Sequence, residues 1–289
     1  MKRLLILILV LCNLALLPIS FVNAQNTLLW EISGNEIIAP CYLYGTFHLM
    51  CKDDIQISDS VLKAIDNTTS IYLEMDMDDP NMMMGMLNYV NLKNGKTLPD
   101  LYDNRSDYER LERFFQDSLQ ISLQQLKKMK PSVIVAMLYP KLMPCNRIGG
   151  VEEELVAIGK SKQKTIHGLE TLAFQASLFD QLSEESEAKK LLEAVDSFST
   201  YKQKMMQLIS IYKNQQLDQM EKAMREEDGF ADSKDILLSS RNKNWVAQLK
   251  SIWNKEAVLV AVGAGHLVGD EGLISLFKKE GYQVRAVIH

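Results

Sequence analysis

Two of the four histidines share one local pattern, in which the imidazole comes three residues after a glycine at the end of a strand-like apolar run. The two segments are Gly45-Thr46-Phe47-His48 and Gly263-Ala264-Gly265-His266. In open α/β sheets ligands bind just beyond the carboxyl ends of the strands, and glycine there lets the backbone turn sharply or approach a ligand. Imidazole binds manganese, cobalt and zinc and transfers protons near neutral pH. If the two strands are neighbours in one sheet, His48 and His266 face one cavity.

Two glutamates are the candidate carboxylates for the same site. Glu74 ends the β-rich run Ser70–Glu74, and Glu170 follows the predicted strand Lys164–Ile166. Both side chains would emerge on the strand-end face that carries the histidines, where a metal or a proton-transfer site needs an acid. For either glutamate alone, a helix-start or surface carboxylate is the simpler interpretation.

Three further polar residues are weaker candidates. Arg241 and Asn242 open the predicted helix that carries Trp245, and a planar guanidinium suits an anion or a substrate carbonyl. The alternative is a helix-surface arginine with an asparagine near the cap. His167 is either a spare ligand or a structural histidine, and the structural role is the more common one.

The remaining motifs exclude or weaken other functions. The chain contains no Walker loop, serine-protease elbow or H-E-x-x-H motif. The segment Gly263–Gly269 resembles a dinucleotide fingerprint only superficially, because no βαβ unit follows it, and we reject a nucleotide role. The methionine cluster Met82–Met86 suits a soft-metal site or an apolar lip, although packing is the common use of methionine.

The elements that must position these residues alternate along the chain. A β-hairpin is predicted at Leu28–Ile32 and Tyr42–Tyr44, with a turn at Gly34-Asn35. Other predicted elements, given in chain order, are a helix from Asp59, the strand Ser70–Glu74, helices from Met82 to about Pro144, the helix Glu152–Lys160, the strand Lys164–Ile166, an amphipathic region Ser183–Glu227, a helix with Trp245 and Leu249, the strand Ala257–Val262, a helix at Leu273–Lys279 and the strand Gln283–Ile288.

This order predicts an α/β fold in which a mixed central β-sheet is flanked by helices. Residues 25–289 form one domain, and the amphipathic region at about 183–227 is a long helical insertion or cap. The first and last strands must meet in the sheet for the core to close.

Composition and charge narrow the class of protein. Hydrophobic residues make up 47% of the 289 and charged residues 24%, as in a globular chain. A net charge of −5 offers no basic field for nucleic acid, so we expect no nucleic-acid partner. Residues 1–24 have the charged start, the apolar core and the small-residue end of a signal peptide. We therefore expect a secreted or periplasmic protein with no stable membrane span after cleavage, although an uncleaved N-terminal anchor is the alternative.

We expect disulfide formation in an exported protein, because an oxidising compartment favours disulfides. Cys41, Cys51 and Cys145 remain after cleavage. Cys41 begins a strand-like run, whereas the other two lie in predicted loops, so we expect a Cys51–Cys145 bridge and a buried Cys41 thiol. A three-thiolate metal site is disfavoured because no C-x-x-C spacing occurs.

Several segments, in this order and spacing, resemble the TraB/GumN family and its TIKI-like metalloproteases over essentially the whole mature chain. These segments are Leu29–Ile32, Tyr44–His48, Tyr72–Asp76, Gly168–Thr171, Arg241-Asn242 with Trp245, and Val262–Leu267. The resemblance implies a fold like that of erythromycin-esterase-like and ChaN-like proteins. It also implies a metal centre at His48, His266 and Glu74, with Glu170, Arg241 and Asn242 as further family positions.

Three functions follow as hypotheses. The first is a metal-dependent hydrolase of peptides, or of a small molecule, that uses manganese, cobalt or zinc. In it one of Glu74 and Glu170 binds the metal, the other accepts a proton from water, and Arg241 and Asn242 steady the oxyanion. The second is a protein that binds haem, metal or a peptide without turnover, as ChaN-like relatives bind haem. The third is metal-free hydrolysis of an ester, in which a histidine activates water directly.

Overall fold

The computed structural model describes residues 26–35, 37–226 and 233–288, and the predicted signal peptide lies outside them. Six strands form one sheet in the order β6-β4-β7-β2-β1-β8. Their bounds are Leu29–Ser33 (β1), Cys41–Thr46 (β2), Ser70–Met75 (β4), Thr165–Glu170 (β6), Val258–Gly263 (β7) and Gln283–Ala286 (β8). A separate two-stranded ribbon pairs Met50–Cys51 (β3) with Ile148–Gly149 (β5). The predicted mixed sheet is confirmed.

The first and last parts of the chain meet in this sheet. Strand β2 lies parallel to β7, which lies parallel to β4, and β4 lies parallel to β6. The hairpin partner β1 is antiparallel to both β2 and β8. Every residue of β2 and β7 is buried, as expected for central parallel strands covered on both faces. The carboxyl ends of four neighbouring strands therefore share one edge.

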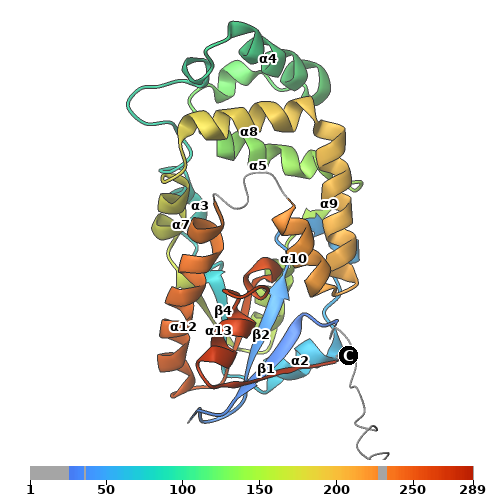
Figure 1. The fold of residues 1–289 in the computed structure, drawn as a ribbon, viewed down its shortest axis with the longest axis vertical. Helices are drawn as coiled ribbons and strands as arrows, with labels where there is room; N and C mark the ends of the chain where they lie inside the picture. Colours follow the sequence, from blue (N-terminus) through green and yellow to red (C-terminus); the bar gives the residue numbers. More distant parts are fainter. Residues whose placement is uncertain (1–25, 36, 227–232, 289) are drawn as a thin grey trace, which may run out of the picture.

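Helices cover the sheet and pack on one another around it (Figure 1). Helices α2 and α6 contact the parallel strands, whereas α13 packs on α12 and on β8. The helices in this part of the fold are α2 (Asp59–Asp66), α6 (Val151–Ser161), α7 (Leu172–Phe179), α9 (Phe198–Lys213), α10 (Leu217–Arg225), α12 (Ser240–Trp253) and α13 (Leu273–Lys279). A π-helical turn, Asp235–Ser239, leads directly into α12.

A second hydrophobic core lies away from the sheet, where α4, α5 and α8 pack together in the upper half of Figure 1. These helices span Arg105–Leu119, Pro131–Leu142 and Glu184–Asp196. The amphipathic region predicted as an insertion, about 183–227, is three helices in the described residues: α8 joins this second core, whereas α9 and α10 bury Ile209, Tyr212 and Met220 in the main core. The cap is therefore built from two distant parts of the chain.

Some predicted boundaries differ from the structure. Strand β6 continues to Glu170 and does not end at Ile166, because Leu169 is buried and the backbone keeps its pairing with β4. The last strand ends at Ala286 in place of Ile288, where its pairing with β1 stops. The predicted turn at Gly34-Asn35 is present, with both residues at positive φ.

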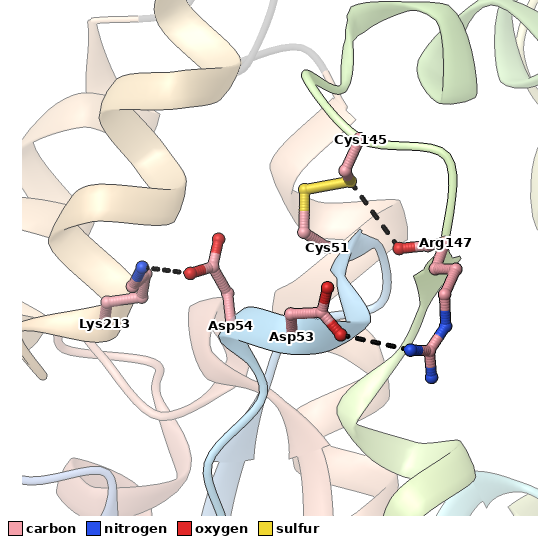
Figure 2. The surroundings of a disulfide bond; sticks show 6 residues. All are labelled: Cys51, Asp53, Asp54, Cys145, Arg147 and Lys213. Atoms are coloured by element: carbon pink, nitrogen blue, oxygen red, sulfur yellow. Dashed lines mark hydrogen bonds and ion pairs between the residues drawn. A yellow bond between two sulfur atoms is a disulfide. The ribbon is translucent and has the colours of Figure 1, made fainter.

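Cys51 and Cys145 form a disulfide, and Cys41 is a buried free thiol, as predicted. Figure 2 shows that the segment after Cys51 is held on two further sides: Asp53 pairs with Arg147, and Asp54 pairs with Lys213 on α9. The bridge therefore ties the segment just after His48 to the segment that precedes α6. Within the described ranges, no helix has the length and the apolar character needed to cross a membrane.

Candidate functional site

The four neighbouring parallel strands β6, β4, β7 and β2 bring together four of the residues predicted to form a site. Glu74 and Glu170 are in the last two residues of β4 and β6, while His48 and His266 follow the ends of β2 and β7 within three residues. The register aligns these ends, since Thr46 is opposite Gly263 and Met75 is opposite Glu170. The sheet thus supplies two imidazoles and two carboxylates to one edge.

The two histidines face the same carboxylate oxygen. Nε2 of His48 lies 3.8 Å from Oε1 of Glu74, and Nε2 of His266 lies 3.7 Å from that same atom. This oxygen also accepts a hydrogen bond of 2.9 Å from the backbone N–H of Gly263. A Cβ atom at Gly263 would lie 3.1 Å from Nε2 of His48 and 3.3 Å from Oε1 of Glu74. Glycine at this position therefore keeps the space between the three side chains open.

The other nitrogen of each imidazole is held by a buried acceptor. Nδ1 of His48 is 2.6 Å from Oε1 of Glu152, which also accepts a hydrogen bond from the hydroxyl of Thr46. Nδ1 of His266 is 2.7 Å from Oδ1 of Asn242. An amide oxygen only accepts hydrogen bonds, so Nδ1 of His266 carries the proton and Nε2 presents its lone pair. Histidines that bind metals are oriented through the second nitrogen in this way.

Arg241 lies behind the two glutamates with all five of its N–H donors engaged. Nε and Nη2 bind Glu170 at 3.0 and 2.8 Å, and Nη2 also binds Oε2 of Glu74 at 2.5 Å. Nη1 donates to the carbonyl of Leu237 at 2.9 Å and lies 3.1 Å from Nε2 of His266. The guanidinium is therefore the buried counter-charge of both carboxylates.

Asn242 is likewise committed to the protein. Besides accepting from Nδ1 of His266, it donates to the backbone carbonyls of His266 at 3.2 Å and Glu271 at 2.8 Å. Both donors of Asn242 and all donors of Arg241 thus have partners. Their expected action on a substrate oxyanion remains a prediction, since it requires a donor to leave its present partner.

The pKa values of Glu74, His266 and His48 are shifted far from their ordinary values. Burial opposes the charge on Glu74, but His266, His48 and Arg241 hold its pKa near 2. Burial lowers the pKa of His266 to about 3, so its imidazole is neutral. Desolvation opposes the charge on His48, yet the hydrogen bond and charge of Glu152 raise the His48 pKa to about 9. The two histidines therefore differ in protonation at pH 7.

The histidines also differ in access to solvent. The His48 side chain is 64% exposed, whereas that of His266 is 5% exposed. Gly150 explains how His48 is placed, because a Cβ atom there would lie 2.7 Å from the His48 carbonyl oxygen and 2.7 Å from Glu152. A ligand can thus approach Glu74 from the His48 side.

Two residues of the site, Glu152 and Gln175, were not predicted from the sequence. Glu152 is one of three consecutive glutamates at the start of α6, a position that a helix dipole alone explains. Gln175 of α7 donates to Glu170 at 3.0 Å and to Glu74 at 3.4 Å. Neither has a local signal in the sequence, because both reach the site only through helix packing. His167, considered as a spare ligand, stacks on Tyr72 inside the sheet.

The donors His48, His266 and Glu74 suit a first-row divalent metal by type. Two ligands of one tetrahedral zinc ion lie about 3.4 Å apart, close to the 3.7 and 3.8 Å observed here. Across the part of the chain that the structure describes, however, no group of three His, Cys, Asp or Glu side chains is already spaced to hold a metal. Coordination by His266 would require Nη1 of Arg241 to leave Nε2.

The fold and the site together define an α/β protein with a histidine–carboxylate–arginine cluster at the carboxyl ends of parallel strands, where α/β proteins bind ligands. The chain matches the TraB/PrgY/gumN family over residues 28–286, and it belongs to that family.

Two similar proteins are named Metalloprotease TIKI2. The one from Danio rerio is 30% identical over 90 residues, which is 31% of this chain and 17% of the relative. The one from Xenopus tropicalis is 32% identical over 89 residues, or 30% of this chain and 16% of the relative. The matched region is thus less than a fifth of either relative. No solved structure matches the chain.

Proposed function

We propose that this protein is a metal-dependent hydrolase that acts on peptides. The observation that carries the proposal is the convergence of two imidazole Nε2 atoms on one carboxylate oxygen, with both Nδ1 atoms held by buried acceptors. The names of the two relatives support a metalloprotease, although only short segments match. Manganese, cobalt and zinc all suit two imidazoles and a carboxylate.

In this proposal His48, His266 and Glu74 would hold the metal. A divalent ion bound there would polarise the scissile carbonyl and make water a better nucleophile at neutral pH. Glu152 and Asn242 orient the two imidazoles through Nδ1, and loss of the proton from His48 accompanies binding, because an imidazole binds metal only when deprotonated.

Arg241 and Glu170 are assigned to positioning. Glu170 is 4% exposed, and both of its oxygens accept hydrogen bonds from Arg241. Arg241 in turn holds Oε2 of Glu74 and leaves Oε1 facing the histidines. The sequence predicts that whichever glutamate does not bind the metal accepts the proton; we propose positioning for Glu170 instead, because both of its oxygens already bind Arg241.

We place this activity outside the cytosol, in a secreted or periplasmic protein. The support is the Cys51–Cys145 disulfide, because such bonds persist in oxidising compartments. N-terminal sequencing of the exported protein would test the predicted cleavage near Gln25.

The test is cleavage of a peptide library by the wild-type protein, with and without added manganese, cobalt or zinc, alongside measurement of bound metal. The variants are His48→Ala and His266→Ala, and the matched control is His167→Ala, which removes a histidine outside the site. We expect metal-stimulated cleavage and metal content to be lost in the first two and retained in the control. Equal activity in all four proteins would refute the proposal.

A second candidate is metal-free hydrolysis. The observation that favours it is the position of Arg241, whose guanidinium already neutralises Glu74 beside His266. Once Nη1 of Arg241 leaves Nε2, a neutral His266 would accept a proton from water, and a protonated His48 would donate one to the leaving group. Cleavage that survives a strong chelator but requires both histidines would select this mechanism.

A further inference from the structure

A cavity of about 250 Å³ lies beside the site, among helices α3, α5 and α7. Helix α3 (Met82–Met86) is the methionine cluster noted in the sequence. The walls are apolar over most of their surface, with contributions from Met75, Met86, Val133, Leu172, Ala176 and Phe179. The cavity would therefore accept an apolar group more readily than a charged one.

Two wall residues of the cavity adjoin the histidine–carboxylate cluster. Gln175 lines the cavity and donates hydrogen bonds to Glu170 and Glu74. Met75, another wall residue, directly follows Glu74 in β4. A substrate bound with its reacting group near Glu74 would thus have a neighbouring side chain at the cavity mouth.

Exposed apolar side chains lie on α3 and α7, two of the helices that line the cavity, and at Leu87 just after α3. Met84 is 68% exposed and Leu87 is 58% exposed, and large apolar side chains of this kind are uncommon in clusters on a monomer surface. The others are Met86, Phe174 and Phe179. Methionine suits such a surface, because its flexible thioether adapts to ligands of different shapes.

The size and the charge of the cavity define what fits. An apolar cavity of about 150 Å³ is enough to bind benzene, so this one has room for a phenylalanine, leucine or methionine side chain. The one ionised group in its wall is Lys130, which pairs with Asp180 at 2.5 Å, and Lys93 pairs with the same carboxylate at 2.7 Å. These two lysines disfavour a basic substrate side chain.

We propose that this cavity is a specificity pocket for a large apolar side chain on a substrate residue that flanks the scissile bond. The inference rests on the proposed peptidase activity and adds a substrate class to it. The methionine helix then serves as an adaptable wall of the pocket.

The test uses Ala176→Trp, which places an indole in the cavity, and Ala173→Trp as the matched control on the same helix outside the cavity wall. Peptides that differ at one residue near the cleavage site (Phe, Leu, Ala, Asp or Lys) are compared by kcat/KM. We expect the wild type to prefer Phe or Leu over Ala by roughly 10- to 100-fold, as the burial of a large apolar side chain allows. Ala176→Trp should abolish this preference, so that the Phe, Leu and Ala peptides have similar kcat/KM values, and Ala173→Trp should behave as the wild type.

A binding measurement separates this inference from the proposed function. In protein labelled with 13C at the methionine methyls, acetyl-phenylalanine amide should shift the signals of Met75 and Met86 in the wild type and in Ala173→Trp, but not in Ala176→Trp. Cleavage without an apolar preference, or a preference that survives Ala176→Trp, would overturn the pocket and leave the hydrolase proposal standing. If no peptide is cleaved, the hydrolase proposal fails. In that case methyl shifts that appear in the wild type and disappear in Ala176→Trp support the pocket, and the absence of shifts in the wild type overturns it.

Discussion

Replacement of Arg241 by methionine tests the charge arrangement of the site. The guanidinium is the buried counter-charge for Glu74 and Glu170 and is itself only 8% exposed. Methionine keeps much of the side-chain volume but removes five N–H donors and one positive charge. Two buried carboxylates are then left close together without their common partner.

The expected cost follows from this burial. Removing one partner of a buried ion pair destabilises a protein by about 3–5 kcal/mol, because the remaining charge is uncompensated. The loss should be largest at neutral pH. Arg241 helps to lower the pKa of Glu74, so in the variant the folded-state pKa of Glu74 rises, and the difference from the wild type shrinks as pH falls.

The assay is denaturant unfolding at pH 7 and pH 5 under non-reducing conditions. Arg105→Met is the control, because that side chain is 91% exposed and pairs with Glu109 on its own helix, so its loss should cost less than about 0.5 kcal/mol. A double variant that adds Glu170→Gln to Arg241→Met should recover part of the lost stability. A cost below about 1 kcal/mol for Arg241→Met, or additive effects in the double variant, would refute the buried-pair interpretation.

Three other predictions concern the His48 side of the site. Replacing Cys51 and Cys145 by serine should lower the free energy of unfolding by about 2–4 kcal/mol and weaken metal binding, because the bridge closes a long loop and anchors the segment after His48. Denaturation and metal titration measure these two effects, and unchanged stability would contradict the prediction. The His48 pKa of about 9 exceeds its unfolded value, so the contribution of protonated His48 to stability is complete below pH 6.5 and is lost as pH rises through 9. NMR titration should show a lower His48 pKa in Glu152→Gln, and an unchanged value would exclude Glu152 as the cause. Gly263→Ala should reduce metal-dependent cleavage roughly 10- to 100-fold with little change in the unfolding midpoint, since its Cβ enters the space beside Nε2 of His48; full activity would show that this space is not used.

Local patterns were sufficient for most of the sheet and for its strand-end residues. The apolar runs at Cys41–Thr46 and Val258–Gly263 are buried parallel strands, and each is followed by the predicted histidine. The family resemblance is confirmed over residues 28–286. The bridge between Cys51 and Cys145 was also predictable, because Cys41 begins an apolar strand-like run and these two cysteines do not, although Cys51 is in the short strand β3.

The construction of the cap was not predictable from local patterns. Periodicity marks α4 and α8 as amphipathic, and α5 is apolar along most of its length, but neither pattern says which apolar faces meet. Their common core joins residues on both sides of β6, and that pairing depends on long-range packing. The same packing brings α3 against α7 and creates the apolar cavity.

The sequence by itself determined which chemical groups stand at the strand ends, because a strand, a glycine and a histidine or glutamate form a local pattern. Only the tertiary structure decided how those groups are tuned. The position of Glu152 against His48, and of Arg241 between Glu74 and Glu170, depends on how α6 and α12 pack around the sheet. Electrostatic interactions and burial act through space, so residues far apart in the chain set the protonation of His48 and His266.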